Sequence, residues 1–270
     1  MVSPQGYALI TGASSGIGEE FARQLAARGW SLVLVARSQD RLEQVRGELM
    51  SAHMGIDVVA IPLDLTVSGA PAELFQRTQA AHLDVDLLVN NAGVGALGEF
   101  ASLDLNRVRQ MLDLNIVALV ELAHLYLQPM MRRRRGSIIH IASVAGFAPL
   151  PYSAVYAATK AFVKSFSDAL FEEARQRGVH VMAVNPGTTE TNFFRVAGES
   201  PFSHRARMQT SAEVVRESLR AFDRKKSSIV TGTSNRLLVV ALTLLPRRWI
   251  TSAVARAMRR ANIGVPGKGQ

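Results

Sequence analysis

Hydrophobic and polar residues follow two different periods along most of the chain. Short runs rich in Val, Ile and Leu are separated by longer stretches in which apolar side chains recur every three or four positions. The short runs predict buried β-strands, and the longer stretches predict amphipathic α-helices. The predicted strands are Tyr7–Ile10, Ser31–Val35, Asp57–Ile61, Leu87–Val89, Ser137–Ile141 and Val179–Val184. The predicted helices are Gly18–Arg28, Arg41–His53, Pro71–His82, Asn106–Met131 and Val155–Arg177.

This order of elements predicts an α/β fold. Strands separated by helix-length segments form βαβ units, in which the strands lie parallel, helices cover both faces of the sheet and crossovers are right-handed. No internal repeat or low-complexity linker interrupts the pattern, so residues 1–235 are predicted to form a single domain. The segment Thr189–Met208 follows a predicted strand and has no strong periodicity, which makes it the best candidate for a mobile lid.

Composition adds two restrictions. The chain has 270 residues, of which 48% are apolar, so it can bury a substantial core and is not typical of a disordered protein. It contains no cysteine, which excludes disulfides and thiolate metal sites. The N-terminal residues enter the first predicted strand without the basic and apolar segments of a secretory signal, so we expect a cytoplasmic location.

The formal net charge of +9 is concentrated towards the C-terminal end. Residues 1–194 carry 16 Lys and Arg against 18 Asp and Glu, whereas residues 195–270 carry 15 against 4. From Arg224 onward ten residues are basic and none is acidic. We therefore treat residues 236–270 as a basic amphipathic extension. The separate run Arg132–Arg135 is predicted to be a solvated basic face.

A glycine-rich turn follows the first predicted strand and opens the first predicted helix. Gly12, Gly16 and Gly18 are spaced as G-x-x-x-G-x-G. Glycines permit a tight turn and a close approach of the backbone to a pyrophosphate, and the helix N-terminus supplies N–H donors and a positive dipole end. The spacing differs from the G-x-G-x-x-G fingerprint, and many loops are rich in glycine. The place of this turn between strand and helix nevertheless favours a dinucleotide site.

The residues after the second predicted strand bear on the type of dinucleotide. Many dinucleotide sites carry an acidic residue there, which binds the adenosine ribose hydroxyls. This chain has Arg37 instead, with Arg41 close behind. A guanidinium suits a 2′-phosphate through a bidentate contact, although Arg37 in isolation could be an ordinary surface residue. Because the acidic residue is missing, we predict that NADP(H) is preferred over NAD(H).

Tyr156 and Lys160 form a candidate pair for proton transfer. They stand four residues apart on a predicted helix and so share a face, and Ser143 lies upstream, just after a predicted strand. A free tyrosine has a pKa of about 10 and exchanges protons poorly at neutral pH. An ammonium beside a phenol stabilises the phenolate, so we expect Lys160 to lower the pKa of Tyr156. The spacing alone is common on ordinary helices; the glycine turn in the same domain makes it informative.

Together these motifs resemble those of the short-chain dehydrogenase/reductase family along residues 5 to about 195. Several separated motifs occur in the order typical of that family, which makes chance agreement improbable. They are Thr11-Gly12-x-x-x-Gly16-x-Gly18, Asp64, Asn90-Asn91-Ala92-Gly93, Asn115, Ser143, Tyr156-x-x-x-Lys160 and Asn185-Pro186-Gly187. The resemblance implies a Rossmann-type doubly wound parallel sheet and an NAD(P)-dependent oxidoreductase acting on alcohols and carbonyls.

The resemblance also implies four catalytic residues. Tyr156 acts as the general acid that gives a proton to the substrate oxygen, and Ser143 hydrogen-bonds the same oxygen. Lys160 holds the nicotinamide ribose, and Asn115 anchors a water relay to Lys160. Each has a plainer alternative: Ser143 could bond backbone after its strand, and Asn115 could be a buried polar group facing a neighbouring helix.

The cofactor residues follow from the same resemblance. Asp64 bonds the adenine amino group, and the turn at Asn91 backs the adenosine ribose. The predicted cofactor set is Gly12, Ser14, Ser15, Gly16, Ile17, Gly18, Arg37, Asp64, Leu65, Asn91, Ala92, Gly93, Tyr156, Lys160, Pro186, Gly187 and Thr191. The resemblance also places Pro186, Gly187 and Thr191 on the loop that cradles the nicotinamide, the nicotinamide loop. Family members often have Val or Ile where this chain has Thr189 in that loop, so the resemblance supports the placement of this loop less strongly than that of the other motifs.

The predicted substrate site is apolar. Its residues are Ser143, Ala145, Tyr156 and Phe193, with further apolar residues between the serine and the tyrosine. Such a lining suits a hydrophobic ketone, aldehyde or acyl chain, although the same residues could be core or a subunit contact. No metal site is predicted, because the six histidines show no ligand spacing with Asp or Glu.

The C-terminal extension admits several interpretations. Its apolar run Leu237–Leu245 precedes Pro246-Arg247-Arg248-Trp249 and is too short to span a bilayer, which needs about 20 residues. It could pack on the core or a neighbouring subunit, or make peripheral contact with an anionic membrane. Nucleic acid is not expected as a partner, because aromatic residues are not interleaved with the basic ones. The family resemblance implies a homodimer or homotetramer.

Three functional hypotheses remain. The leading one is an NADPH-dependent carbonyl reductase that acts on a hydrophobic ketone or aldehyde. The second is a 3-oxoacyl reductase acting on carrier- or CoA-linked chains, since basic surfaces attract acidic carriers and phosphates. The third, of a different class, is an NADP-binding redox sensor without turnover, against which the complete Asn-Ser-Tyr-Lys set argues.

Overall fold

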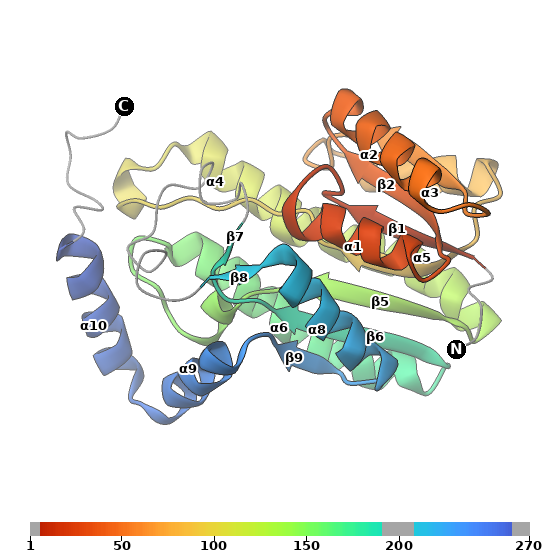
Figure 1. Cartoon of the computed structure of the whole chain (residues 1–270). Coiled ribbons are helices and arrows are strands. Elements are labelled where there is room, and N and C mark those ends of the chain that lie inside the picture. The colour runs from red at the N-terminus through yellow and green to blue at the C-terminus, as the bar shows by residue number, and fades with distance from the viewer. Residues whose placement is uncertain (1–5, 191–207, 261–270) are drawn as a thin grey trace.

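Seven parallel strands form the central sheet of the computed structural model, which describes residues 6–190 and 208–260. Their order is β3-β2-β1-β4-β5-β6-β9 (Figure 1). The strands are β1 (Tyr7–Thr11), β2 (Ser31–Ala36), β3 (Val58–Pro62), β4 (Val85–Asn90), β5 (Gly136–Ile141), β6 (Val179–Asn185) and β9 (Ser228–Val230). Two short strands, β7 (Thr189–Glu190) and β8 (Gln209–Thr210), pair separately. The predicted α/β fold with a doubly wound parallel sheet is confirmed.

Helices cover both faces of the sheet because each strand is apolar on both sides. Successive strand residues point to opposite faces: Ala8 and Ile10 of β1 enter one core cluster, and Leu9 enters the other. The first cluster is closed by α1 (Gly16–Ala26), α2 (Gln39–Ala52) and α8 (Ser211–Asp223). The second is closed by α3 (Ala70–Ala80), α5 (Leu119–Arg133) and α6 (Ala154–Arg175).

The helix predicted at Asn106–Met131 consists of three parts. It begins as α4 (Leu105–Leu112), passes through the π-helix η2 (Asp113–Ala118) and continues as α5. By length and composition alone this run could cross a membrane. In the structure Leu122 and Tyr126 of α5 lie in the core, so the helix is apolar because it packs on the sheet.

The run Arg132–Arg135 is exposed to solvent, as its sequence predicts, and two of its arginines also form ion pairs with the protein. Arg133 Nη2 and Arg135 Nη2 lie 3.5 and 3.1 Å from the carboxylate of buried Asp86, at the start of β4. Arg134 ends α5 in the left-handed conformation, with a φ of 52°. Arg133 and Arg135 reach Asp86 from this exposed face, because a buried carboxylate needs a positive partner.

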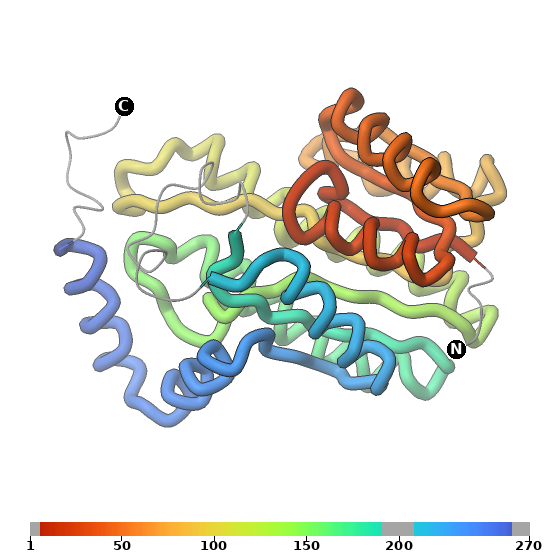
Figure 2. Tube along the Cα trace, in the orientation of Figure 1, coloured from red at the N-terminus to blue at the C-terminus, as the bar shows by residue number. Residues whose placement is uncertain are grey.

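Elements after β6 were not predicted. α8 begins with a capping box between Thr210 and Glu213, and β9 adds the edge strand. α9 (Thr233–Leu244) and α10 (Arg247–Arg260) follow at the end of the molecule towards which the strand arrows of Figure 1 point, and they form the blue end of the tube in Figure 2. α9 lies against η3 (Val144–Phe147), the 3₁₀ turn that follows β5. The division of the chain between residues 235 and 236 stays a prediction, and α9 begins just before it.

The strand order reverses beside β1. β2 and β3 extend to one side of β1, whereas β4, β5, β6 and β9 extend to the other. At such a switch point the crossovers leave in opposite directions and open a crevice outside the carboxyl ends of the strands, where ligands bind in open α/β sheets. The turns after β1, β4 and β5 therefore define the place to look for a site.

Candidate active site

The glycine turn lies between β1 and α1, as the sequence predicts. Gly12 and Gly16 have φ angles of 67° and 60°, a region that side chains rarely adopt. Gly18 has no room for a side chain: an added Cβ would overlap the carbonyl oxygen of Gly12 and lie 2.5 Å from Nδ2 of Asn91. Ser15 is the N-cap of α1, and its side chain makes no capping hydrogen bond. The turn thus presents backbone at a helix N-terminus, which fits the pyrophosphate of a dinucleotide.

Thr11 and Asn91 join this turn to the end of β4. Thr11 Oγ1 accepts hydrogen bonds from the backbone N–H groups of Asn91, at 3.0 Å, and Ala92, at 2.9 Å. Asn91 Nδ2 donates to the carbonyl of Thr11 at 2.8 Å. The side chain of Asn91 therefore holds two loops of the crevice together, and the predicted contact of this turn with the adenosine ribose would come through backbone.

Arg37 and Asp64 meet at the ends of β2 and β3. Arg37 Nη1 lies 4.0 Å from Asp64 Oδ2, and the Arg37 side chain is 64% exposed. The other oxygen of Asp64 accepts from the backbone N–H and the hydroxyl of Thr66, at 3.0 and 2.8 Å. Arg41, by contrast, lies 3.0 Å from the carboxylate of Glu19. Of the two arginines, Arg37 is the more exposed and has the longer contact with a carboxylate.

Ser143, Tyr156 and Lys160 come together at the carboxyl end of β5. Ser143 caps η3, where its Oγ accepts from the N–H of Ala145 at 3.1 Å. Tyr156 and Lys160 lie in the first two turns of α6, with Lys160 Nζ 5.8 Å from the centre of the Tyr156 ring. Lys160 is buried, and its Nζ donates to the carbonyl of Ile141 at 2.8 Å.

The expected lowering of the Tyr156 pKa is not found. Burial raises the pKa of Tyr156 to about 12, and the hydrogen bond with Ser143 opposes that rise. Burial also lowers the pKa of Lys160 to about 8. The prediction was wrong in sign because it considered the ammonium alone, whereas both groups lose water when α6 packs against β5. Tyr156 therefore remains protonated at neutral pH.

Asn115 lies in the π-helix and ties three segments together. Its amide accepts from Val94 N–H and donates to Val94 C=O, both at 2.9 Å, and also donates to Thr159 Oγ1 at 3.1 Å. An added Cβ at Gly93 would lie 3.1 Å from Asn115 Oδ1 and 3.5 Å from Lys160 Nζ. The structure thus brings Gly93, Asn115 and Lys160 into contact distance, and the water relay assigned to Asn115 stays a prediction.

The loop after β6 closes the other side of the site. The carbonyl of Pro186 accepts from Val144 N–H at 3.0 Å and from Ser143 Oγ at 3.5 Å. A side chain at Gly187 would overlap Asn235 of α9. Thr189 is buried and donates to the carbonyl of Gly187 at 3.0 Å. Thr191 and Phe193, and most of the predicted lid, lie outside the described residues.

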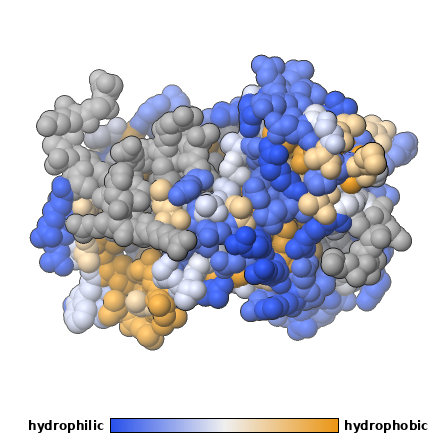
Figure 3. All heavy atoms as spheres, in the orientation of Figure 1, coloured by the Kyte–Doolittle hydropathy of each residue, from blue (hydrophilic) through white to orange (hydrophobic). Residues whose placement is uncertain are grey.

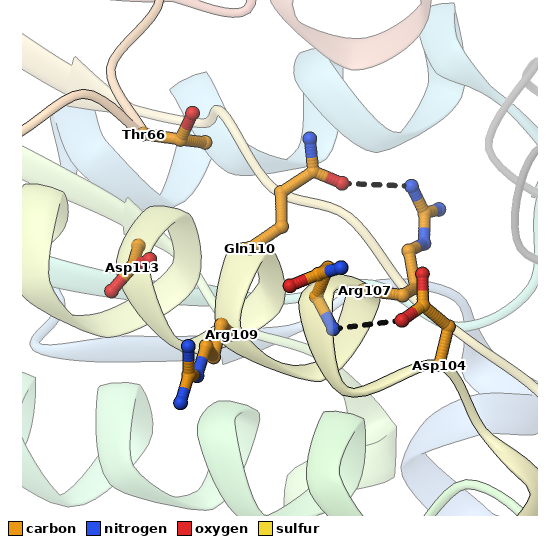
Figure 4. A pocket seen from close by; sticks show the side chains of 7 residues that line it. Thr66, Asp104, Arg107, Arg109, Gln110 and Asp113 are labelled. Carbon is orange, nitrogen blue, oxygen red and sulfur yellow. Dashed lines mark hydrogen bonds between the residues drawn. The ribbon is translucent and has the colours of Figure 1, made fainter.

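Two cavities near the crevice were not predicted. One, of about 360 Å³, lies between α4 and the loop after β3 (Figure 4). It is lined by Thr66, Asp104, Asn106, Arg107, Arg109, Gln110 and Asp113. The other, of about 570 Å³, is lined by Gly16, Glu19, Glu20, Arg23, Glu190, Met208 and Ser211. Neither cavity is lined by Ser143, Tyr156 or Lys160.

In Figure 4, Arg107 and Gln110 of α4 turn towards each other, and Thr66 faces them from the loop after β3. Arg107 donates to Gln110 Oε1 at 3.0 Å and to the carbonyl of Gly95 at 2.9 Å. Arg107 therefore fixes α4 to the loop that follows β4. Sequence reasoning did not single out this residue.

Three further groups near the site were missed. Thr11 bridges the loops after β1 and β4, Thr159 joins Asn115 to α6, and the carbonyl of Ile141 orients Lys160. Thr159 also donates to the carbonyl of Tyr156 at 2.7 Å. Thr11 and Thr159 stand within motifs that the sequence displays, so their positions were available as a signal. The carbonyl of Ile141 carries no signal, because every residue has one.

Fold and site together define a class of protein. A ligand crevice at the switch point, a glycine turn at a helix N-terminus and a tyrosine–lysine pair beside a serine are the parts of a nicotinamide-dependent oxidoreductase. A profile of the short chain dehydrogenase family matches residues 6–201. The chain belongs to the short-chain dehydrogenase family.

Known proteins illustrate the range of this similarity. A very-long-chain 3-oxoacyl-CoA reductase from Macaca fascicularis is 34% identical over 194 residues, which cover 70% of this chain and 61% of that protein. The chain thus spans less than two thirds of that relative's length. A short-chain dehydrogenase from Sphingobium yanoikuyae, solved in complex with NADPH, is 31% identical with a TM-score of 0.79 and covers 98% of this chain and 99% of its own. A bulky-bulky ketone specific alcohol dehydrogenase from Comamonas testosteroni is 30% identical with a TM-score of 0.75, covering 98% and 97%.

Proposed function

We propose that this protein reduces the carbonyl of a hydrophobic substrate to an alcohol with NADPH. The observation that carries the proposal is the meeting of Ser143, Tyr156 and Lys160 at the carboxyl end of β5, beside the crevice. The glycine turn fits the cofactor, since Gly12 and Gly16 adopt positive φ angles and the turn presents backbone at the N-terminus of α1. When bound, NADPH supplies the hydride.

The protein's own residues manage the charge on the substrate oxygen. Negative charge develops there as the carbonyl is reduced, and hydrogen-bond donors aimed at it lower the barrier. Tyr156 is protonated at neutral pH because its pKa is raised, so it can give a proton to that oxygen. Ser143, hydrogen-bonded to Tyr156, offers a second donor to the same atom. Lys160, with its pKa lowered to about 8, remains mostly charged at pH 7 and is oriented by Ile141.

A test of this mechanism replaces Tyr156 by Phe. We expect the turnover of NADPH with a ketone substrate to fall by about 100-fold or more, because the proton donor is removed. Tyr7→Phe is the matched control, since Tyr7 bonds Asp57 at the opposite end of the sheet. NADPH binding, followed by cofactor fluorescence, should be retained by both variants. Near-normal turnover by a folded Tyr156→Phe protein would refute the mechanism.

We propose NADPH rather than NADH because Arg37 is the exposed cation at the end of β2. Arg37→Ala should raise the KM for NADPH by about tenfold and leave the KM for NADH unchanged, since a charge-assisted bond to a phosphate is lost. Arg41→Ala is the control, because Arg41 is paired with Glu19 and should change either KM little. Equal effects of Arg37→Ala on the two cofactors would contradict the proposal.

A 3-oxoacyl thioester is the second candidate substrate. The specific support is the 34% identity to a protein named very-long-chain 3-oxoacyl-CoA reductase. The 30% identity to a bulky-bulky ketone specific alcohol dehydrogenase supports the broader ketone proposal. A spectrophotometric screen of NADPH oxidation against ketones, aldehydes and 3-oxoacyl-CoA esters separates these substrates. Tight NADPH binding without turnover on any of them would favour the non-catalytic sensor.

A further inference from the structure

α9 turns an apolar stripe outward. Leu237, Val240, Ala241 and Leu244 recur at the spacing of one helix face, and Leu237 and Leu244 are 69% and 78% exposed. Val239, on the opposite face, is only 9% exposed. A surface helix of a water-soluble domain normally turns polar side chains outward instead. Figure 3 shows the result as an orange patch at the lower left of the molecule, over α9.

The patch continues into the turn that leads to α10. Leu245 and Trp249 are 48% and 60% exposed. A contiguous apolar surface of this kind marks an interaction site, whereas single exposed apolar residues do not.

α10 supplies positive charge beside the patch. Ile250 and Met258 attach one face of α10 to the protein, at 6% and 3% exposure. The helical spacing puts Trp249 and most of the arginines on the other face. The exposed arginines of α10 are Arg247, Arg248, Arg256, Arg259 and Arg260. Within the described ranges none of them forms an ion pair, and Figure 3 shows the blue surface of α10 on the same side of the molecule as the orange patch.

The apolar stripe, the tryptophan and the exposed arginines together decide which partner this surface fits. A second copy of the same surface would bring arginines against arginines in a two-fold contact. An anionic lipid surface accepts all three features: acyl chains take the apolar side chains, headgroup phosphates take the guanidinium groups, and tryptophan favours the boundary between them. We propose that α9 and α10 dock on an anionic membrane, with the α9 stripe entering the boundary between headgroups and acyl chains.

The docked surface adjoins the candidate active site. α9 lies against η3, and its Asn235 packs on Gly187 of the nicotinamide loop. Docking therefore holds the η3 side of the crevice near the bilayer, from which a lipid-dissolved carbonyl compound can enter. This last consequence rests on the proposed function, whereas the docking itself does not.

Vesicle co-sedimentation of the full chain, without cofactor or substrate, tests the proposal. We expect binding to vesicles that contain phosphatidylglycerol, little binding to phosphatidylcholine alone, and weakening by salt. The pair Leu237→Ser and Leu244→Ser should weaken binding by about tenfold or more, since two exposed apolar anchors are lost. The pair Arg248→Gln and Arg256→Gln should weaken it by about fivefold for each charge removed.

Matched controls come from other surfaces of the chain. Met54→Ser with Val67→Ser removes two exposed apolar residues, and Arg220→Gln with Arg224→Gln removes two exposed charges from and just beyond α8. Neither control pair should change vesicle binding. Light scattering of the wild type and the leucine variant, without lipid, reports the oligomeric state.

Three outcomes would overturn the proposal. They are absence of wild-type binding to anionic vesicles, unchanged binding by the leucine variant, and a loss of oligomer mass in that variant without lipid. The last outcome would identify the stripe as a subunit contact. Because binding is measured without substrate, a failure of the reductase hypothesis leaves this result unaffected, and NADPH turnover by the leucine variant in lipid-free buffer tests that hypothesis separately.

Discussion

Lys160 and His140 are both buried, and neither forms an ion pair within the described part of the chain. Burial lowers the pKa of Lys160 to about 8 and that of His140 to about 3. Each side chain has one hydrogen-bond partner, Ile141 C=O for Lys160 and Ser167 Oγ for His140, both at 2.8 Å. For both side chains the loss of water on burial lowers the pKa more than the single hydrogen bond can raise it. Burial therefore favours the uncharged form of each group.

We expect His140 to make the stability of the protein sensitive to mild acid. The folded state keeps its imidazole neutral down to a pH of about 3, whereas the unfolded chain binds a proton below about 6.5. The unfolded state therefore holds more protons between these values, and the free energy of unfolding should fall by about 1.4 kcal/mol per pH unit below 6.5. Denaturant titrations of wild type and His140→Gln should be made between about pH 7 and pH 5. The free energies of unfolding of the two proteins should converge as the pH falls. Parallel curves would show that His140 does not titrate on unfolding.

The elements near the site are shaped by single local features. One π-helix interrupts the run from α4 to α5 and carries Asn115, and π-helical turns are frequent at functional sites. Gly18 lets α1 approach the turn that precedes it, so the helix N-terminus points into the crevice. In each case the geometry of one element places a functional group.

Gly18→Ala and Gly47→Ala should have opposite effects, although both residues lie inside helices. An alanine at Gly18 would overlap the Gly12 carbonyl, so we expect a loss of about 1–3 kcal/mol in the free energy of unfolding. The same overlap should raise the KM for NADPH. Nothing lies within 4 Å of a Cβ at Gly47, and alanine there should stabilise the protein by about 0.5–1 kcal/mol. Thermal unfolding and cofactor titration compare the two; a neutral Gly18→Ala variant would contradict the packing argument.

In the whole molecule, the two ends of the central sheet carry residues with different functions. The carboxyl ends of β1, β4 and β5 carry the glycine turn, Gly93 and Ser143. The amino end of β4 carries Asp86, whose carboxylate is approached by Arg133 and Arg135 from the end of α5. The first group lies at the crevice, whereas the second lies at the other end of the strands and is expected to act on stability alone.

Asp86→Asn should lower stability without changing catalysis. Removing the charge takes one carboxylate from both Arg133 and Arg135, but both arginines are partly solvated, so we expect a loss of about 1–2 kcal/mol in the free energy of unfolding. The control is Asp84→Asn, since Asp84 pairs with Arg133 from a side chain that is 68% exposed and should contribute less. Denaturation and steady-state kinetics provide the measurements. A fall in kcat at full stability would show that the two sheet ends are coupled.

The sequence by itself determined the strands up to β6, the helices between them and the residues that could react. These features depend on local spacing: alternating apolar runs fold as strands, the glycines after β1 permit one kind of turn, and Tyr156 and Lys160 share a helix face wherever that helix lies. The elements after β6 could not be predicted, because β9 is short and α9 carries apolar residues around much of its circumference. The π-helix could not be predicted either, because it does not interrupt the apolar pattern of the helix that contains it.

Only the tertiary structure decided the direction of the pKa shifts, the partners of Thr11 and Asn115, and the outward side of α9. Each depends on residues far away in sequence. Lys160 is desolvated where it meets Ile141 at the end of β5, Asn115 donates to Thr159, and Asn235 packs on Gly187. Desolvation and long-range hydrogen bonds arise from which segments pack together, and local periodicity carries no information on that packing. The sequence thus identifies the reactive side chains, whereas the packing around those side chains sets their protonation states.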